Sequence, residues 1–211
     1  MKSKLFLFFS IVFSILLNQT NFVWAEGAII SIEPSFQSIP QVGETFTINV
    51  SISNIENLFG YDFILWYNTT VLDCLSVEWP EGHFLTPTKN PNNIFNIETI
   101  EDNFNETTGA VRVVATLTNG EPPKNGSGLL VKITFNSTAT GSSLLRLYWP
   151  GYIYPAKLSD PAGNPIPCSA NTSEVIVIPE YSVLAIFLVV VTLTVTVIII
   201  WRGRRAQLAL I

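Results

Sequence analysis

Polar and apolar residues alternate along much of the chain. The segment from Thr45 to Ser53 alternates for nine residues without interruption, which predicts a half-buried antiparallel strand. Similar segments recur at short intervals, separated by turn-forming pairs such as Asn119-Gly120. The pattern predicts strands at 28–33, 44–53, 58–67, 70–79, 94–100, 110–118, 128–136, 143–149 and 173–178, with a less well marked strand at 153–158.

The segment between residues 26 and 178 has no stretch with the 3.6-residue period of an amphipathic helix. Many short strands without helices are typical of two sheets that bury their inner faces against each other. About 155 residues are enough for one domain with a substantial core. We therefore predict an all-β fold, a β-sandwich or jelly roll, that forms a single domain over residues 26–178.

The predicted strand at 58–67 is unusually aromatic and mostly apolar on both sides. Because side chains alternate across a strand, its two faces carry Phe59, Tyr61, Phe63, Leu65 and Tyr67, and Leu58, Gly60, Asp62, Ile64 and Trp66. Such a strand lies centrally in its sheet, with one face in the core and the other covered. A binding partner is one candidate for this cover.

The N-terminal residues have the pattern of an export signal. Lys2 and Lys4 precede an apolar stretch, and Val23-Trp24-Ala25 places small or branched residues at the positions that a signal peptidase requires. The pattern predicts a signal peptide over residues 1–25 and a mature chain that begins at Glu26.

The C-terminal residues have the pattern of a membrane anchor. Residues 183–201 include no charged residue, and nineteen helical residues cross roughly 28 Å of hydrocarbon. Three arginines follow within residues 202–205 and favour the cytoplasmic side. We therefore predict a single-pass anchor at 179–201, a cytoplasmic tail at 202–211 and an extracellular domain.

Acidic residues dominate the predicted extracellular segment. All sixteen Asp and Glu residues lie between residues 26 and 180, with six Lys and Arg residues, for a formal charge of −10. Such a surface repels phosphate, and no basic stripe interrupts it. The charge therefore argues against nucleic acid as a partner.

The chain has two cysteines, Cys74 and Cys168. Export to an oxidising compartment favours a disulfide between them, which would close a long loop and stabilise the fold. Two unpaired thiols are the alternative, because the sequence carries no information on the geometry that a disulfide needs.

Few residues are candidates for catalysis. The single histidine, His83, lies in a predicted loop, and the sequence has no phosphate-binding glycine loop, nucleophile elbow or Cys/His cluster. The irregular stretch 80–109 also lacks a cluster of reactive side chains, so we interpret it as a tolerated loop, with a functional loop as the alternative. We expect no enzyme activity, no cofactor and no metal ion.

Six Asn-X-Ser/Thr sequons fall in the predicted extracellular segment. A composition rich in Asn, Ser and Thr would produce several sequons without any glycosylation. Asn49 and Asn136, however, lie on the polar phase of their strands, where a sugar would point outward. The candidate glycosylation sites are Asn49, Asn68, Asn105, Asn125, Asn136 and Asn171.

Three groups of motifs follow one another along nearly the whole extracellular segment. They read VGETFTINVSISNIENLFGYDFILWYNTTVLDCLSVEWPEGHFL, then GAVRVVATLT with GSGLLVKITFNSTATGSSLLRLY, and finally LSDPAGNPIPCSANTSEVIVI. Their order and spacing resemble those of cohesin domains, which occur in cellulosome scaffolds and as stand-alone relatives on microbial surfaces.

The resemblance implies a nine-stranded jelly roll that binds a dockerin through an outer sheet face. The strand at 58–67 matches the family's central strand, so the resemblance implies partner contacts by Asp62, Ile64 and Trp66 on its outward phase. For Ile64 and Trp66, ordinary packing under a loop is the alternative. Two positions depart from the family pattern. Gly60 stands where the family has a polar residue, and Asn68-Thr69 stands where it has Asp-Pro.

Our first hypothesis is a membrane-anchored extracellular cohesin-like module that binds a dockerin-bearing or other extracellular protein. The alternatives are a carbohydrate-binding module that holds polysaccharide on aromatic rings, and a structural envelope or adhesion protein without a discrete ligand. Pro179-Glu180-Tyr181 before the apolar span also resembles the sorting tails that archaeosortases and exosortases recognise. Such processing would replace the anchor with a lipid and still leave the domain outside.

Overall fold

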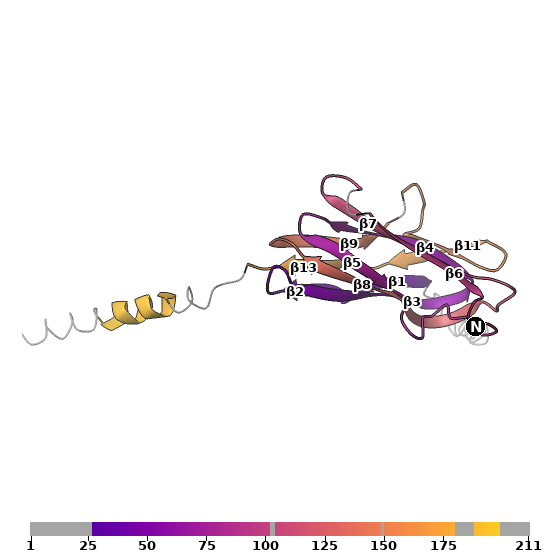
Figure 1. Ribbon diagram of the computed structural model, residues 1–211, viewed down its shortest axis with the longest axis horizontal. Coiled ribbons are helices and arrows are strands. Elements are labelled where there is room, and N and C mark those ends of the chain that lie inside the picture. The colour runs from indigo at the N-terminus through magenta and orange to yellow at the C-terminus, as the bar shows by residue number, and fades with distance from the viewer. Residues whose placement is uncertain (1–26, 102–103, 149, 180–187, 199–211) are drawn as a thin grey trace, which may run out of the picture.

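The computed structural model describes residues 27–101, 104–148, 150–179 and 188–198, with a helical segment at 188–198. Figure 1 shows the strands stacked in two layers. The strands are β1 (Ala28–Glu33), β2 (Phe36–Ile39), β3 (Thr45–Leu58), β4 (Gly60–Asn68), β5 (Leu72–Glu78), β6 (Ile94–Glu101), β7 (Thr108–Leu117), β8 (Lys124–Ser137), β9 (Gly141–Leu147), β10 (Ala156–Ser159), β11 (Pro165–Ile166), β12 (Cys168–Ala170) and β13 (Ser173–Val177).

One layer is a five-stranded sheet in the order β12-β1-β3-β8-β5. Its two long strands, β3 and β8, pair antiparallel from Thr45↔Asn136 to Leu58↔Lys124 with shifts of register on the way. Such irregularities bend a strand pair and increase its twist, which lets two 14-residue strands follow the curvature of the sandwich.

The other layer is an eight-stranded sheet built around β4. One edge of β4 pairs with β7 along all nine residues from Gly60 to Asn68. Along the other edge, β10 pairs with Gly60–Phe63 and β9 pairs with Leu65 and Trp66. Beyond these neighbours lie β6 on one side and β11, β13 and β2 on the other. The predicted central position of the aromatic strand is therefore confirmed.

The hydrophobic core lies between the two sheets, and the alternation of side chains decides which residues enter it. On β4 the inward residues Tyr61, Phe63, Leu65 and Tyr67 are all buried. The ring of Tyr67 meets that of Phe135 on β8 edge-on at 5.1 Å between centroids. Each fully buried side chain of this size contributes roughly 1.5–3 kcal/mol.

The core is complete within one segment of the chain. Among the described residues, every buried apolar side chain lies between Ala28 and Val177. A segment that contains all of its own core can fold as a unit. The single domain over residues 26–178 stays a prediction.

The predicted all-β sandwich is confirmed, but the predicted count of nine strands is wrong. The described residues form thirteen strands, and each predicted strand corresponds to one of them. The strands absent from the prediction are β2, with four residues between Pro34 and Pro40, and the two short strands β11 and β12. Segments this short have no measurable alternation.

The predicted disulfide is wrong, because neither Cys74 nor Cys168 forms a disulfide among the described residues. Cys74 lies on β5 and Cys168 on β12, at opposite edges of the five-stranded sheet. Four strand spacings of about 4.8 Å separate these edges by roughly 19 Å, whereas the Cα atoms of a disulfide lie within about 7 Å. Burial raises the pKa of the Cys168 thiol.

The chain ends lie largely outside the described residues. The predicted signal peptide at 1–25 and the predicted tail at 202–211 fall entirely there, as do residues 183–187 and 199–201 of the predicted span. Within the described part of the chain, no helix has the length and apolar character needed to cross a membrane.

The predicted irregular stretch 80–109 contains the regular strand β6 and a loop that is anchored to the domain before it. Glu121, which is 3% exposed, accepts hydrogen bonds from the backbone nitrogens of Thr88, Lys89 and Asn90 and from Nδ2 of Asn93. Burial alone would raise the pKa of Glu121, but these bonds lower it to about 2. Glu121 therefore holds the loop as a carboxylate.

The same loop inserts His83 between the ends of the two sheets. His83 is 7% exposed, and its Nε2 lies 2.7 Å from the hydroxyl of Tyr61 on the inner face of β4. The ring of Trp79 meets the imidazole edge-on at 5.2 Å. Burial lowers the pKa of His83 from 6.5 to about 4, so the imidazole is neutral in the folded protein at pH 7.

We predict that His83 makes the domain less stable as the pH falls from 6.5 to about 4. In this range the unfolded chain binds a proton at His83 and the folded chain does not, so the free energy of unfolding falls by roughly 2 kcal/mol, discounted for residual solvent access. In His83→Gln, an amide can still bond Tyr61 and this titration is absent. Urea unfolding at pH 6.5 and 4.5 measures the free energy of unfolding of both proteins. An equal decrease between the two pH values in wild type and His83→Gln would contradict the assignment.

Candidate functional site

The outward face of β4 lies at the centre of the eight-stranded sheet. It carries Asp62, Ile64 and Trp66, the three residues that the sequence analysis singled out, after Gly60 at the start of the strand. Asp62 and Ile64 are half-buried. A Cβ atom at Gly60 would lie 3.0 Å from the Thr116 side chain and 3.2 Å from the Ala115 carbonyl oxygen. A side chain at this position would therefore require β7 to shift by a few tenths of an ångström.

Asp62 is held by an arginine that the sequence analysis missed. Arg112 on β7 donates from Nε and Nη2 to the two carboxylate oxygens of Asp62, at 3.0 and 2.8 Å. This hydrogen bonding raises the pKa of Arg112. A bidentate pair fixes the orientation of both groups. The negative charge of Asp62 is therefore balanced by Arg112 within the protein itself.

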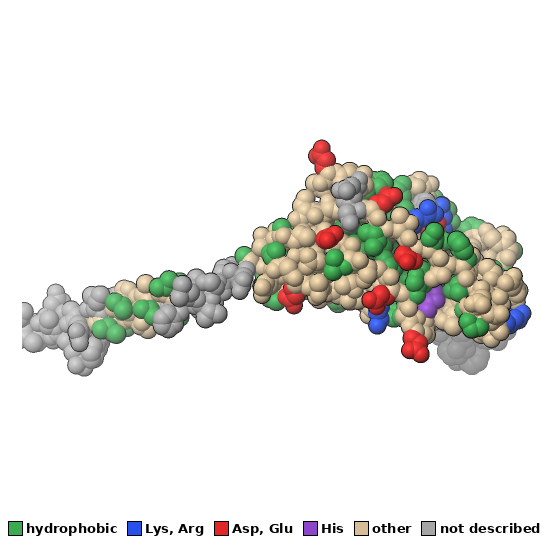
Figure 2. Space-filling view, viewed as in Figure 1, with side chains coloured by type: hydrophobic (Ala, Val, Ile, Leu, Met, Phe, Trp, Pro, Cys, Tyr) green, Lys and Arg blue, Asp and Glu red, His purple; other side chains and the backbone are tan. Residues whose placement is uncertain are grey.

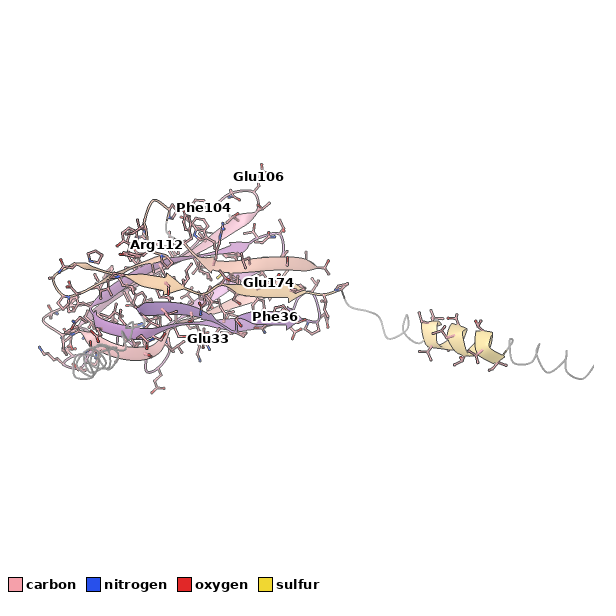
Figure 3. All side chains as sticks on the ribbon, turned by 180° about the vertical axis from the view of Figure 1, so that it is seen from behind. Glu33, Phe36, Phe104, Glu106, Arg112 and Glu174 are labelled. Carbon is pink, nitrogen blue, oxygen red and sulfur yellow. The ribbon has the colours of Figure 1, made fainter. Side chains whose placement is uncertain are left out.

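Trp66 is largely covered. Its exposure is 7%, its Nε1 donates to the Tyr148 carbonyl oxygen at 2.7 Å, and the ring of Phe104 meets it edge-on at 4.5 Å. Phe104 itself is 53% exposed and lies along the rim near Arg112 (Figure 3). Trp66 is therefore packed under a neighbouring segment, which was the alternative to partner contact at this position. The exposed aromatic surface here belongs to Phe104.

Exposed apolar residues extend this face toward the edge strand β6. Phe95 and Ile97 are 54% and 49% exposed, and they lie cross-strand from Thr116 and Val114 of β7. Figure 2 shows apolar and acidic side chains intermixed on the visible side of the domain. The alternation in Ile94–Glu101 indicated the strand, but only its register with β7 places Phe95 and Ile97 beside the predicted site.

Two hollows lie on either side of Trp66. The first, about 270 Å³, is lined by Ile64, Trp66, Thr99, Glu101, Phe104, Ala110 and Arg112. The second, about 390 Å³, is lined by Trp66, Tyr67, Asn68, Thr107, Thr108, Ser142, Leu144 and Arg146. The first hollow is mainly apolar with one charge of each sign, and the second is mainly polar with a single cation.

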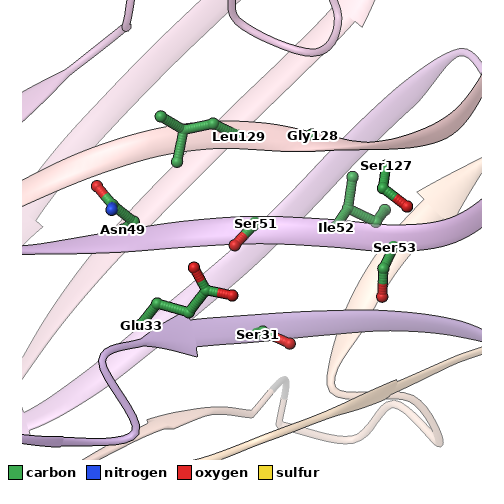
Figure 4. A pocket seen from close by; sticks show the side chains of 9 residues that line it. All are labelled: Ser31, Glu33, Asn49, Ser51, Ile52, Ser53, Ser127, Gly128 and Leu129. Carbon is green, nitrogen blue, oxygen red and sulfur yellow. The ribbon is translucent and has the colours of Figure 1, made fainter.

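The opposite face of the sandwich has a different character. The outer surface of the five-stranded sheet holds a shallow trough of about 410 Å³, lined by Ser31, Glu33, Asn49, Ser51, Ile52, Ser53, Ser127, Gly128 and Leu129 (Figure 4). The hydroxyl oxygen of Ser51 is buried and has no hydrogen-bond partner among the described residues. No aromatic side chain lines this trough.

The candidate glycosylation sites are distributed over both faces. Asn49, Asn136 and Asn171 belong to the outer side of the five-stranded sheet, where Asn49 lines the trough and Asn171 Nδ2 lies 3.4 Å from the Ser31 hydroxyl. Asn68 and Asn105 lie near the second hollow of the other face, and Asn125 is the second residue of β8. Asn105, Asn125 and Asn171 are exposed.

Groups for catalysis or metal binding do not converge in the described part of the chain. No cluster of three or more His, Cys, Asp or Glu residues there could hold a metal ion. His83, the single candidate for proton transfer, is enclosed against Tyr61 and Trp79. The arrangement on the outer face of β4 suits recognition of a surface.

Comparison with known proteins agrees with this architecture. A family model described as the cohesin domain matches residues 35–145. A non-cellulosomal cohesin from the hyperthermophilic archaeon Archaeoglobus fulgidus is 18% identical with a TM-score of 0.52, and the alignment covers 74% of this chain and 94% of that one. A search of curated proteins found no match.

Two bacterial structures are similar to the same extent. A cohesin from a type I cohesin–dockerin complex of Clostridium thermocellum is 15% identical with a TM-score of 0.53, over 72% of this chain and 94% of that one. A type II cohesin domain from the cellulosome of Acetivibrio cellulolyticus is 16% identical with a TM-score of 0.52, over 72% and 95%. These likenesses show the fold, and the family model covers more than half of the sequence, so this chain belongs to the cohesin family.

Proposed function

We propose that the protein is a membrane-anchored, extracellular cohesin module that binds a dockerin-bearing protein through the outer face of β4. The observation that carries this proposal is the mixed patch on that face. Half-buried Ile64 and the Asp62–Arg112 ion pair lie beside the exposed Phe95 and Ile97. An apolar centre with a few oriented charged groups is typical of protein–protein interfaces.

The similar structures support the class of partner. Two of them, both from Clostridium thermocellum, are cohesins in complex with dockerins, and another is a cohesin of Acetivibrio cellulolyticus with a Cel5 dockerin. This module would bind its partner as a preformed surface without catalysing a reaction.

Sequence patterns support the location. An export signal at residues 1–25, an uncharged stretch at 183–201 and the arginines that follow it favour an extracellular domain. The last strand, β13, ends at Val177, so only a few residues separate the domain from the predicted span. The domain would therefore stand close to the membrane surface.

A polysaccharide partner is less well supported by this face. Sugar rings stack on flat exposed aromatic surfaces, but the ring pairs here are nearly perpendicular. Trp66 and Phe104 meet at 79°, and Tyr152 and Tyr154 meet at 76°. Carbohydrate binding is therefore an outcome to be tested and not the function that we propose.

We predict that Ile64→Ala/Ile97→Ala weakens binding of a dockerin-bearing protein at least about tenfold, because truncation of central interface residues removes buried apolar contact. The wild-type domain, residues 27–179, would capture proteins from the surface extract of the cells that make it. Mass spectrometry would identify dockerin repeats in the captured protein, and calorimetry would give its affinity for each variant.

The matched control is Ile29→Ala/Leu129→Ala, which truncates two half-buried residues on the outer side of the five-stranded sheet. This control should retain full affinity. The proposal fails if the two double variants weaken binding equally. It also fails if the wild-type domain captures no dockerin-bearing protein and is instead retained on a polysaccharide column.

We also predict that exported protein carries a glycan on Asn49 and that Ser51→Ala removes it at no cost in stability. The sequon needs a hydroxyl at position 51, and that hydroxyl has no partner among the described residues. Removing a buried unpaired polar atom should leave the free energy of unfolding unchanged or raise it by up to about 1 kcal/mol.

Intact mass of the protein from its own cells, together with urea unfolding of unglycosylated protein, would measure both effects. Asn171→Gln is the control, because it removes a different sequon on the same side of the domain and leaves the Asn49 sequon intact. A mass difference no larger than the one oxygen atom that Ser51→Ala removes would contradict modification of Asn49, and a clear loss of stability would show that the Ser51 hydroxyl is bonded.

A further inference from the structure

Basic side chains gather around the outward residues of β4. The segment between residues 26 and 180 has six Lys and Arg residues against sixteen acidic ones. Three of the six lie next to β4 on this one face. Each outward residue has one of them as its cross-strand neighbour: Lys157 for Asp62, Arg112 for Ile64 and Arg146 for Trp66.

The carboxylates on this face leave part of the positive charge unmatched. Asp62 forms an ion pair with Arg112, and this pair is the only one among the described residues. Glu101 lines the first hollow together with Arg112. Arg146 is exposed and forms no ion pair within the described part of the chain. The second hollow therefore contains an available guanidinium.

The chemistry of the second hollow suits a carboxylate. Around Arg146 it has the side chains of Asn68, Thr107, Thr108 and Ser142, and Trp66 and Leu144 supply the apolar part of its lining. A guanidinium with neighbouring hydroxyl and amide groups binds a carboxylate through several hydrogen bonds. A partner that covered Arg146 without an anion would leave a cation buried and unpaired, which is costly.

The first hollow suits an apolar side chain. Ile64, Phe104 and Ala110 form its apolar lining, and its two charged groups, Arg112 and Glu101, have opposite signs. An aliphatic side chain that enters this hollow would bury apolar surface without adding a net charge. The two hollows thus select different side chains of the same partner.

The spacing of the hollows constrains how the partner presents these side chains. Ala110 of β7 and Arg146 of β9 both pair with Trp66, from opposite edges of β4. Two strand spacings separate them by roughly 10 Å. Residues i and i+7 of an α-helix lie roughly 10.5 Å apart along its axis and on the same side of the helix.

We propose that this face recognises a helix with an apolar side chain at position i, for the hollow at Ile64, and a carboxylate at position i+7, for Arg146. This inference rests on the proposed function as a protein-binding module and specifies the charge of the partner. The partner is acidic at the contact although the domain itself is acidic, because charges beyond roughly 8 Å are screened at physiological ionic strength.

The test is selection from a phage-displayed library of 24-residue helical peptides with randomised surface positions, using the domain over residues 27–179 as bait. Peptides selected by the wild type should have Asp or Glu seven residues from an apolar anchor. Arg146→Glu should bind the best of these peptides about tenfold more weakly, and a fresh selection with this variant should enrich Lys or Arg at the same position.

Lys132→Glu is the matched control, since it makes the same change of charge on β8 in the other sheet. It should bind the selected peptides as the wild type does. Selected peptides without an acidic preference, equal losses in the two variants, or failure to select any peptide would overturn the inference. Capture of a dockerin-bearing protein tests the proposed function separately, so either result can fail alone.

Discussion

The pairing of β4 along both of its edges is the constraint on which the rest of the structure depends. With β7 along one edge and β10 and β9 along most of the other, both edges of β4 are largely occupied, and its two faces remain to interact. The inward phase, Tyr61 to Tyr67, closes the core. The outward phase can contact only what covers the sheet, so a partner site on β4 consists of alternate residues and their cross-strand neighbours.

Sequence pattern predicted the elements of the fold well because alternation is a local property. Alternation placed Thr45–Ser53 and the strand at 58–67, and the resemblance to cohesins indicated which phase of the aromatic strand faces inward. The sequence pattern did not predict features that depend on the order of the strands in a sheet. The distance between Cys74 and Cys168 depends on the sheet order β12-β1-β3-β8-β5, which no local signal encodes, and β2 is too short to carry a signal.

The candidate site shows the same division between local and distant information. Asp62 and Ile64 were predicted as contact residues because they share one phase of a strand that the resemblance assigns to the outer face. Arg112 lies fifty residues away, and its pairing with Asp62 depends on the register of β7 against β4. The cover of Trp66 comes from Phe104, outside any strand. Residues on a recognised strand are thus predictable, and the groups that set their charge and exposure are not.

Stability and recognition rest on different parts of this domain. Glu121 and His83 fix the loop after β5 by buried hydrogen bonds, and their protonation changes only below neutral pH. The outer face of β4 has no histidine, and its charged groups are Asp62, Glu101, Arg112, Arg146 and Lys157. Binding through this face would therefore respond to the partner's charge and to ionic strength, whereas the titration of the enclosed His83 acts on the stability of the fold.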